Sequence, residues 1–191
     1  MLQNKTIKQT KNAGYTIVEI LVYIAIFAFV SIAVIDVVIL ATRTASNAGI
    51  NHTLEENGYS AIEGISRMIR LADAIDVANS VFDSNDGVLT LLYYDGTGAV
   101  TTKKIYVSNS YYLNWLTAPH SDVRAVQVDE NGTLLAPFTG RDVKIDSLVF
   151  KHIETANSEA VKIELTITAR NSRTPRTEYF YDTIILRNTY K

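Results

Sequence analysis

The sequence has no cysteine among its 191 residues. Disulfide bonds, thiolate chemistry and cysteine zinc sites are therefore excluded. Neither a Walker pattern nor a dinucleotide-binding glycine pattern occurs, and no Gly-x-Ser-x-Gly motif marks a nucleophilic serine. These absences argue against an enzyme, so we expect no catalytic residue and no cofactor.

Residues that could bind a metal ion are few and poorly spaced. The three histidines, His52, His120 and His152, form no i, i+4 pair and no His-Glu-x-x-His motif, so we interpret them as solvated surface residues and expect no metal site. The acidic segment 83–87 (DSNDG) is similar to a calcium loop, but it lacks the ligand spacing and the later glutamate. Turn chemistry explains this segment better.

Positive charge is concentrated at the N-terminus. Residues 1–14 carry three lysines and no acidic residue, while the whole chain has a net charge of −2. Without this leader the chain has 15 basic and 20 acidic residues and a net charge of −5. An acidic chain does not favour phosphate contacts, so we expect no direct nucleic-acid binding.

A long apolar segment follows the leader. Residues 15–41 are long enough for a membrane-spanning helix and are interrupted by only two acidic residues, Glu19 and Asp36. The preceding lysines predict a cytoplasmic N-terminus and an extracytoplasmic remainder. An ordinary secretory signal and an uncleaved anchor are two interpretations, although residues 41–46 form a poor signal cleavage site. Neither interpretation explains Glu19.

Glu19 stands near the start of this segment, where a carboxylate costs a few kcal/mol or more and is usually kept for a partner. The alternative is that it lies at the headgroup level. Residues 11–22 (KNAGYTIVEILV) strongly resemble the type IV prepilin signature. In that family a basic leader ends in glycine, here Gly14, an aromatic residue follows, here Tyr15, and the fifth mature residue is a glutamate.

The resemblance implies processing and assembly roles for these residues. Prepilin peptidase would cut between Gly14 and Tyr15, and the new amine of Tyr15 would be methylated. Glu19 would meet the amine of a neighbouring subunit and set the axial register. The implied partners are prepilin peptidase, other pilin or pseudopilin subunits, the inner-membrane assembly platform and, before assembly, membrane lipid.

Asp36 departs from many major pilins, which have proline at the corresponding position. It could favour local unwinding, but only weakly. We prefer the interpretation that Asp36 lies at the outer membrane–water boundary.

The chain turns amphipathic after residue 41. Apolar residues recur at helical spacings on one face of residues 42–78, which predicts a helix ending near Ala78. Gly49, Gly58 and Gly64 weaken this helix and indicate either bends or close packing.

The remainder is rich in strand patterns. Two hairpins are expected, the second around an Asn-Gly turn. Further strands follow, and opposite parities within one of them predict a bulge near Ser147. The expected strands are residues 88–94, 100–107, 123–128, 133–138, 143–153, 161–168 and 178–186. No helix–strand alternation occurs, so the sheet should be antiparallel.

These observations predict an α+β, type IV pilin-like fold with a long N-terminal helix packed on an antiparallel β-sheet. The expected parts are a leader (1–14), a membrane-spanning and filament-packing half-helix (15–41), an amphipathic half-helix (42–78) and a globular β domain (79–191). The aromatic cluster 111–116 is interpreted as core rather than as a binding patch.

We expect a structural, minor subunit of a type IV pilus or type II secretion pseudopilus. The missing cysteines, and a weak similarity of residues 22–27 and 185–188 to J-type pseudopilins, favour a minor subunit. Such a protein would be a single-pass protein of the cytoplasmic membrane before it enters a cell-surface or periplasmic filament. The alternative is a membrane-anchored extracellular binding or adhesion module that does not assemble.

Overall fold

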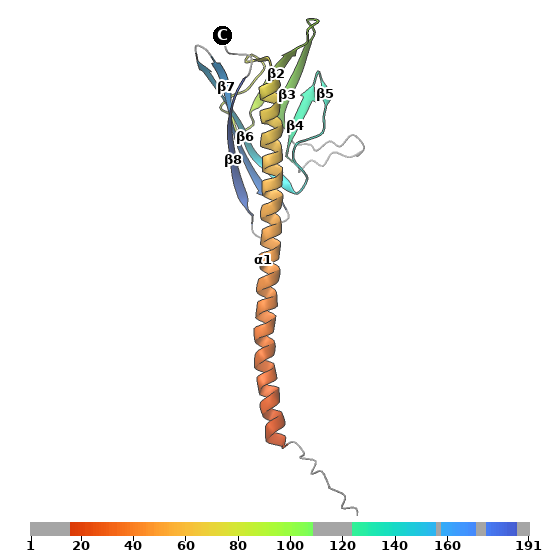
Figure 1. Ribbon diagram of the computed structural model, residues 1–191, viewed down its shortest axis with the longest axis vertical. Coiled ribbons are helices and arrows are strands. Elements are labelled where there is room, and N and C mark those ends of the chain that lie inside the picture. The colour runs from red at the N-terminus through yellow and green to blue at the C-terminus, as the bar shows by residue number, and fades with distance from the viewer. Residues whose placement is uncertain (1–15, 109–123, 156–157, 171–174, 187–191) are drawn as a thin grey trace, which may run out of the picture. The chain divides into compact units, whose positions relative to one another are not determined.

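The fold consists of one long helix followed by eight strands, in a computed structural model that describes residues 16–108, 124–155, 158–170 and 175–186 (Figure 1). The helix α1 spans Ile17–Leu71. The strands are β1 (Ala74–Ile75), β2 (Val88–Tyr94), β3 (Val100–Ser108), β4 (Ala125–Glu130), β5 (Thr133–Leu134), β6 (Val143–Thr155), β7 (Ser158–Ala169) and β8 (Thr177–Ile185). The chain divides into two compact units, residues 1–46 and 47–191.

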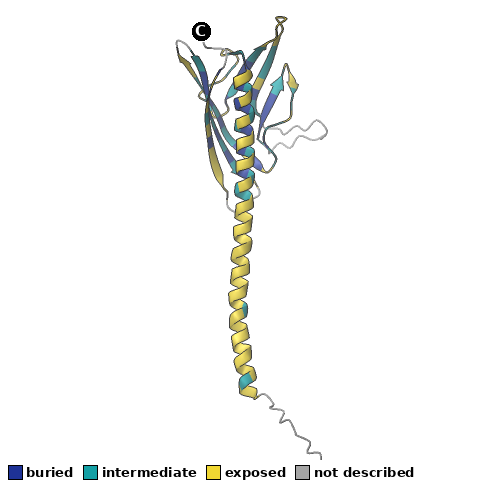
Figure 2. Ribbon diagram, in the orientation of Figure 1, coloured by how far each residue is buried: buried dark blue, intermediate teal, exposed yellow. Residues whose placement is uncertain are grey.

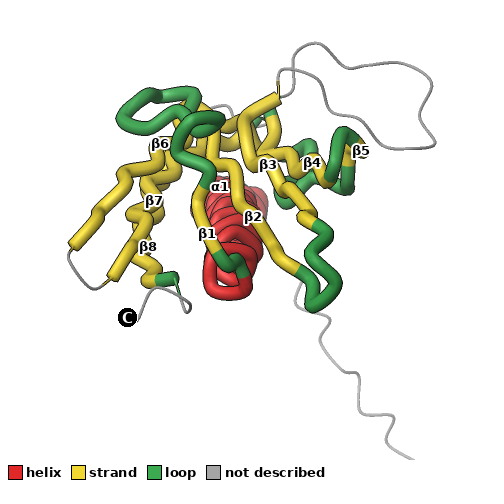
Figure 3. Tube along the Cα trace, turned by 90° about the horizontal axis from the view of Figure 1, so that it is seen from above, coloured by secondary structure: helices red, strands yellow, loops and turns green. Residues whose placement is uncertain are grey.

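The strands form two antiparallel sheets rather than one. Strands β1 to β5 pair in chain order, and β6, β7 and β8 form the second sheet. Figure 3 shows the two sheets flanking the helix. The Ile145 amide donates to the Arg124 carbonyl at 3.2 Å, which links the second sheet to the residue preceding β4. The predicted α+β class with antiparallel pairing is confirmed, and the division into two sheets is new.

One hydrophobic core joins the later part of α1 to both sheets. The helix contributes a stripe of buried residues at spacings of three and four, as its amphipathic pattern predicted. The largest fully buried side chains are Phe150, Leu54, Ile65, Ile69, Leu89, Leu91, Ile105, Ile145, Leu148, Ile163, Leu165 and Ile167.

The second hairpin has the turn that its Asn-Gly dipeptide predicted. Asn131 and Gly132 both have positive φ, 50° and 83°, as a type I′ turn requires. The following strand, β5, has only two residues and is shorter than expected. Regular pairing does not continue to Phe138, because Pro137 has no amide to donate. Beyond β5 the chain still follows β4, since the Leu135 amide donates to the Val128 carbonyl at 2.8 Å.

The predicted end of the helix near Ala78 is wrong. The helix ends at Leu71, and the Asp73 amide already donates to the Leu92 carbonyl at 2.9 Å. The Asp73 carboxylate in turn accepts the Tyr94 amide at 2.7 Å. Pairing with β2 therefore takes the chain out of the helix sooner than local propensity suggests.

The bulge predicted near Ser147 is confirmed. Pairing of β6 with β7 shifts between Ile145 and Ser147, which leaves Asp146 as the extra residue. Because of this bulge, Ile145 and Leu148 are both fully buried, although an odd and an even position of a regular strand would face opposite sides of the sheet.

Candidate functional site

The first turn of α1 carries the residues of greatest interest. Gly14 and Tyr15, the predicted cleavage and methylation residues, lie outside the described residues, so their roles stay predictions. Thr16 caps the helix, because its hydroxyl accepts the Glu19 amide at 3.3 Å. This is one half of a Thr-x-x-Glu capping box, which satisfies an otherwise free amide at the helix start.

Glu19 is half-buried and lies in the first helical turn. A negative charge is favourable there because the free amides give the helix N-terminus a partial positive charge. One turn later the Tyr23 hydroxyl donates to Glu19 Oε1 at 3.0 Å. The carboxylate is therefore held by a phenol of its own helix, while the Glu19 amide is capped by Thr16.

The apolar segment around Glu19 is almost entirely exposed. Every described residue from 16 to 46 is exposed except Glu19 and Ser31, which are half-buried (Figure 2). Large apolar side chains such as Phe27 and Phe29 are 74% and 80% exposed. In the described part of the chain, α1 is the one helix long and apolar enough to cross a membrane, with a peak mean hydropathy of 2.9. Such a surface needs lipid or other apolar helices around it.

Asp36 does not interrupt the helix. It is exposed and lies within continuous helical structure. The structure therefore contains no unwound segment at this position. The interpretation that Asp36 lies at the outer membrane boundary stays a prediction.

The acidic segment 83–87 lies against the second sheet. The Gly87 amide donates to the Leu148 carbonyl at 2.8 Å, and the Leu148 amide donates to the Asn85 carbonyl at 2.8 Å. The Asp86 carboxylate forms an ion pair with the guanidinium of Arg124. This carboxylate already faces a protein cation, which supports the structural interpretation of the segment over calcium binding.

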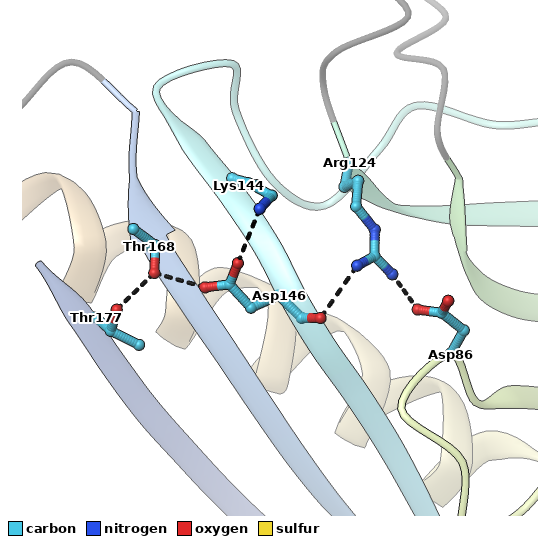
Figure 4. A network of polar contacts seen from close by, with 6 residues as sticks. All are labelled: Asp86, Arg124, Lys144, Asp146, Thr168 and Thr177. Atoms are coloured by element: carbon cyan, nitrogen blue, oxygen red, sulfur yellow. Dashed lines mark hydrogen bonds and ion pairs between the residues drawn. The ribbon is translucent and has the colours of Figure 1, made fainter. Parts of the chain in front are cut away.

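A polar network continues from Arg124 across the second sheet (Figure 4). Arg124 also donates to the Asp146 carbonyl at 3.1 Å, while the Asp146 carboxylate accepts the Thr168 hydroxyl and lies 3.3 Å from Lys144 Nζ. The Thr168 hydroxyl also contacts that of Thr177 at 2.6 Å. Asp146 is the extra residue of the bulge. Its carbonyl binds Arg124, which precedes β4 of the first sheet, and its carboxylate contacts Thr168 and Lys144 within the second sheet.

The histidines do not gather at one place in the described chain. His52 is exposed on α1, and His120 lies outside the described residues. His152 contacts Glu159 at 2.7 Å and stacks on Phe82 at a centroid distance of 5.2 Å. It is half-buried, so its predicted solvated position is wrong; cross-strand packing explains the burial. Among the described residues, no group of three His, Asp or Glu side chains is placed to hold a metal ion.

The outer face of the second sheet is polar and carries exposed aromatic residues. Lys162 and Lys151 both contact Glu164, at 2.8 Å and 3.0 Å, and these hydrogen bonds lower the pKa of its carboxyl. Tyr181, 64% exposed, lies beneath the Lys162 ammonium at 5.9 Å. The other aromatic cluster, residues 111–116, lies outside the described residues.

Sequence reasoning missed three residues of these sites. Thr16 was detectable, since threonine three residues before glutamate is the capping-box signature. Tyr23 was detectable as a residue four positions after Glu19, on the same helix face. Arg124 had no local signal, because its partners are far from it in the sequence.

Comparison with known proteins identifies the N-terminal region. Residues 9–35 match the model of the prokaryotic N-terminal methylation motif. No curated protein and no solved structure shows a significant match to the chain. The motif and the long apolar helix followed by antiparallel sheets support a protein of the type IV pilin and pseudopilin type. They are consistent with a single-pass membrane anchor and suggest a structural rather than an enzymatic protein.

Proposed function

We propose that the chain is a structural, minor subunit of a type IV pilus or type II secretion pseudopilus. Prepilin peptidase cuts it after Gly14, and it assembles with other subunits through α1. The observation that carries the proposal is a carboxylate at Glu19, within the methylation motif and at the start of an exposed apolar helix.

The free amine created by cleavage gives Glu19 its partner. Methylation of the Tyr15 amine keeps its positive charge, so it can pair with Glu19 of a neighbouring subunit. In a helix bundle of low dielectric this attraction is strong, and an unpaired charge is costly. Subunits that align the two groups are therefore favoured, which sets the axial register.

Charge and hydropathy support the first part of the path to the filament, and the resemblance to type IV pilins implies the rest. Leader lysines keep the N-terminus in the cytoplasm, and the apolar part of α1 resides in lipid before assembly. The inner-membrane assembly platform then extracts the subunit, and its apolar surface exchanges lipid for the helices of other subunits. The β domain stays outside the cytoplasm throughout.

Replacing Glu19→Val tests the assembly role. Processing should remain intact, because the cleavage residues are unchanged. Incorporation into filaments should fall by about tenfold or more, because the neighbour's amine loses its counter-charge. Both are measured by immunoblotting, of whole cells for processing and of sheared filaments for incorporation.

Asp36→Val is the matched control, since it removes the other carboxylate of the same apolar segment. It should assemble like the wild type. Wild-type incorporation of the Glu19→Val subunit would contradict the assembly role. A protein that is processed but never enters filaments would instead be an anchored binding module.

A further inference from the structure

Tyr23 is the described side chain that contacts the Glu19 carboxylate. Its hydroxyl donates to Oε1 at 3.0 Å from one helical turn away. Among the described residues, the second oxygen, Oε2, accepts no hydrogen bond. The arrangement leaves one carboxylate oxygen held and one open.

The pair has a physical reason to persist in lipid. A phenol hydroxyl in hydrocarbon needs an acceptor, and a carboxylate needs donors, because unpaired polar groups there are costly. The Tyr23 hydroxyl finds an acceptor, and one oxygen of Glu19 finds a donor, on the same helix and without any second subunit. Their spacing of four residues places both on the same face.

We propose that Tyr23 is a positioning residue for Glu19. Its hydroxyl fixes the carboxylate rotamer so that Oε2 stays available to the incoming amine of a neighbouring subunit. This inference rests on the proposed assembly function and adds a residue to it. Deleting the hydroxyl leaves Glu19 present but free to rotate, which slows or misaligns pairing.

The test is Tyr23→Phe, which keeps the ring and removes the hydroxyl. Its matched control is Ser31→Ala, which removes a hydroxyl from the same apolar segment. The Ser31 hydroxyl donates to the Phe27 carbonyl at 2.8 Å and does not contact Glu19. We expect Tyr23→Phe to lower filament incorporation about tenfold with unchanged processing, and Ser31→Ala to behave like the wild type.

A spectroscopic readout separates positioning from a general effect on the helix. In bilayers containing the processed protein, subtracting the infrared spectrum of Glu19→Gln isolates the carboxylate bands of Glu19. Tyr23→Phe should shift these bands, and Ser31→Ala should not. In the Glu19→Gln background, Tyr23→Phe should cause no further loss of incorporation.

The outcomes distinguish this inference from the proposed function. If Glu19→Val fails to assemble while Tyr23→Phe matches the wild type in bands and incorporation, the positioning role alone is wrong. If Tyr23→Phe shifts the bands and Glu19→Val assembles normally, the contact exists but the assembly function is wrong, and the positioning role is overturned with it.

Discussion

Gly58 and Gly64 are residues at which α1 has no room for a side chain. A Cβ at Gly58 would lie 2.2 Å from the Phe180 ring, and one at Gly64 would lie 2.4 Å from the Phe138 ring. At Gly49 nothing lies within 4 Å. Of the two explanations open from the sequence, close packing is therefore correct for the first two glycines.

Alanine at Gly58 and alanine at Gly49 should have opposite effects on the free energy of unfolding. Gly58→Ala should destabilise the protein by about 1–3 kcal/mol, because Phe180 must leave its place in the core. Gly49→Ala should stabilise it by about 0.5–1 kcal/mol, because alanine loses less backbone entropy in a helix. Chemical unfolding of the detergent-solubilised protein, followed by circular dichroism, measures both. Equal effects of the two substitutions would contradict the packing role of Gly58.

Among the elements of the fold, the two sheets are joined by contacts of Arg124. One guanidinium nitrogen donates to the Asp146 carbonyl in β6, and another pairs with Asp86 in the segment between β1 and β2. The arginine side chain is 25% exposed, but that of Asp86 is 66% exposed, so the ion pair is open to water. The hydrogen bond to the Asp146 carbonyl is partly buried and should contribute more to stability than the exposed ion pair.

Replacing Arg124→Met should lower the free energy of unfolding by about 1–2 kcal/mol, since two hydrogen-bonding partners lose their donor. The control is Arg70→Met, an exposed arginine on α1, which should change stability by less than about 0.5 kcal/mol. Urea unfolding monitored by circular dichroism gives both values. Indistinguishable midpoints for the two variants would show that Arg124 does not join the sheets.

Local patterns predicted the elements better than their ends and junctions. The hairpin β2–β3, the Asn-Gly turn and the bulge in β6 all follow from alternation and turn chemistry. The end of α1 was misplaced because pairing of Asp73 with Leu92, nineteen residues later, overrides helix propensity. The split into two sheets had no local signal, because it depends on distant contacts such as Arg124 with Asp86.

The site shows the same division between local and distant information. Glu19 was found because a carboxylate is conspicuous in an apolar run, and its capping by Thr16 was readable from spacing. The contact with Tyr23 was also within reach, since i, i+4 neighbours meet on a helix. What the sequence lacked was the geometry, which leaves Oε2 of Glu19 open while Oε1 is occupied.

The whole molecule combines a β domain with its own core and a half-helix that has none. The β domain buries its apolar residues against residues 47–71 of α1. Residues 17–46 expose theirs, and this surface is compatible only with lipid or with other apolar helices. In the proposed function this segment lies first in the membrane and then in a filament, where the amine of a neighbouring subunit gives the Glu19 carboxylate its partner.

Mass spectrometry of the N-terminus of the protein purified from its cells tests the central claim most directly. The account predicts a chain that begins at Tyr15 and carries one methyl group on its amine, since only a cut after Gly14 creates the counter-charge for Glu19. A control is Gly14→Val, which should retain the leader and stay out of filaments. An intact leader beginning at Met1 on the wild-type protein, or a chain beginning near Ser46, would contradict the account.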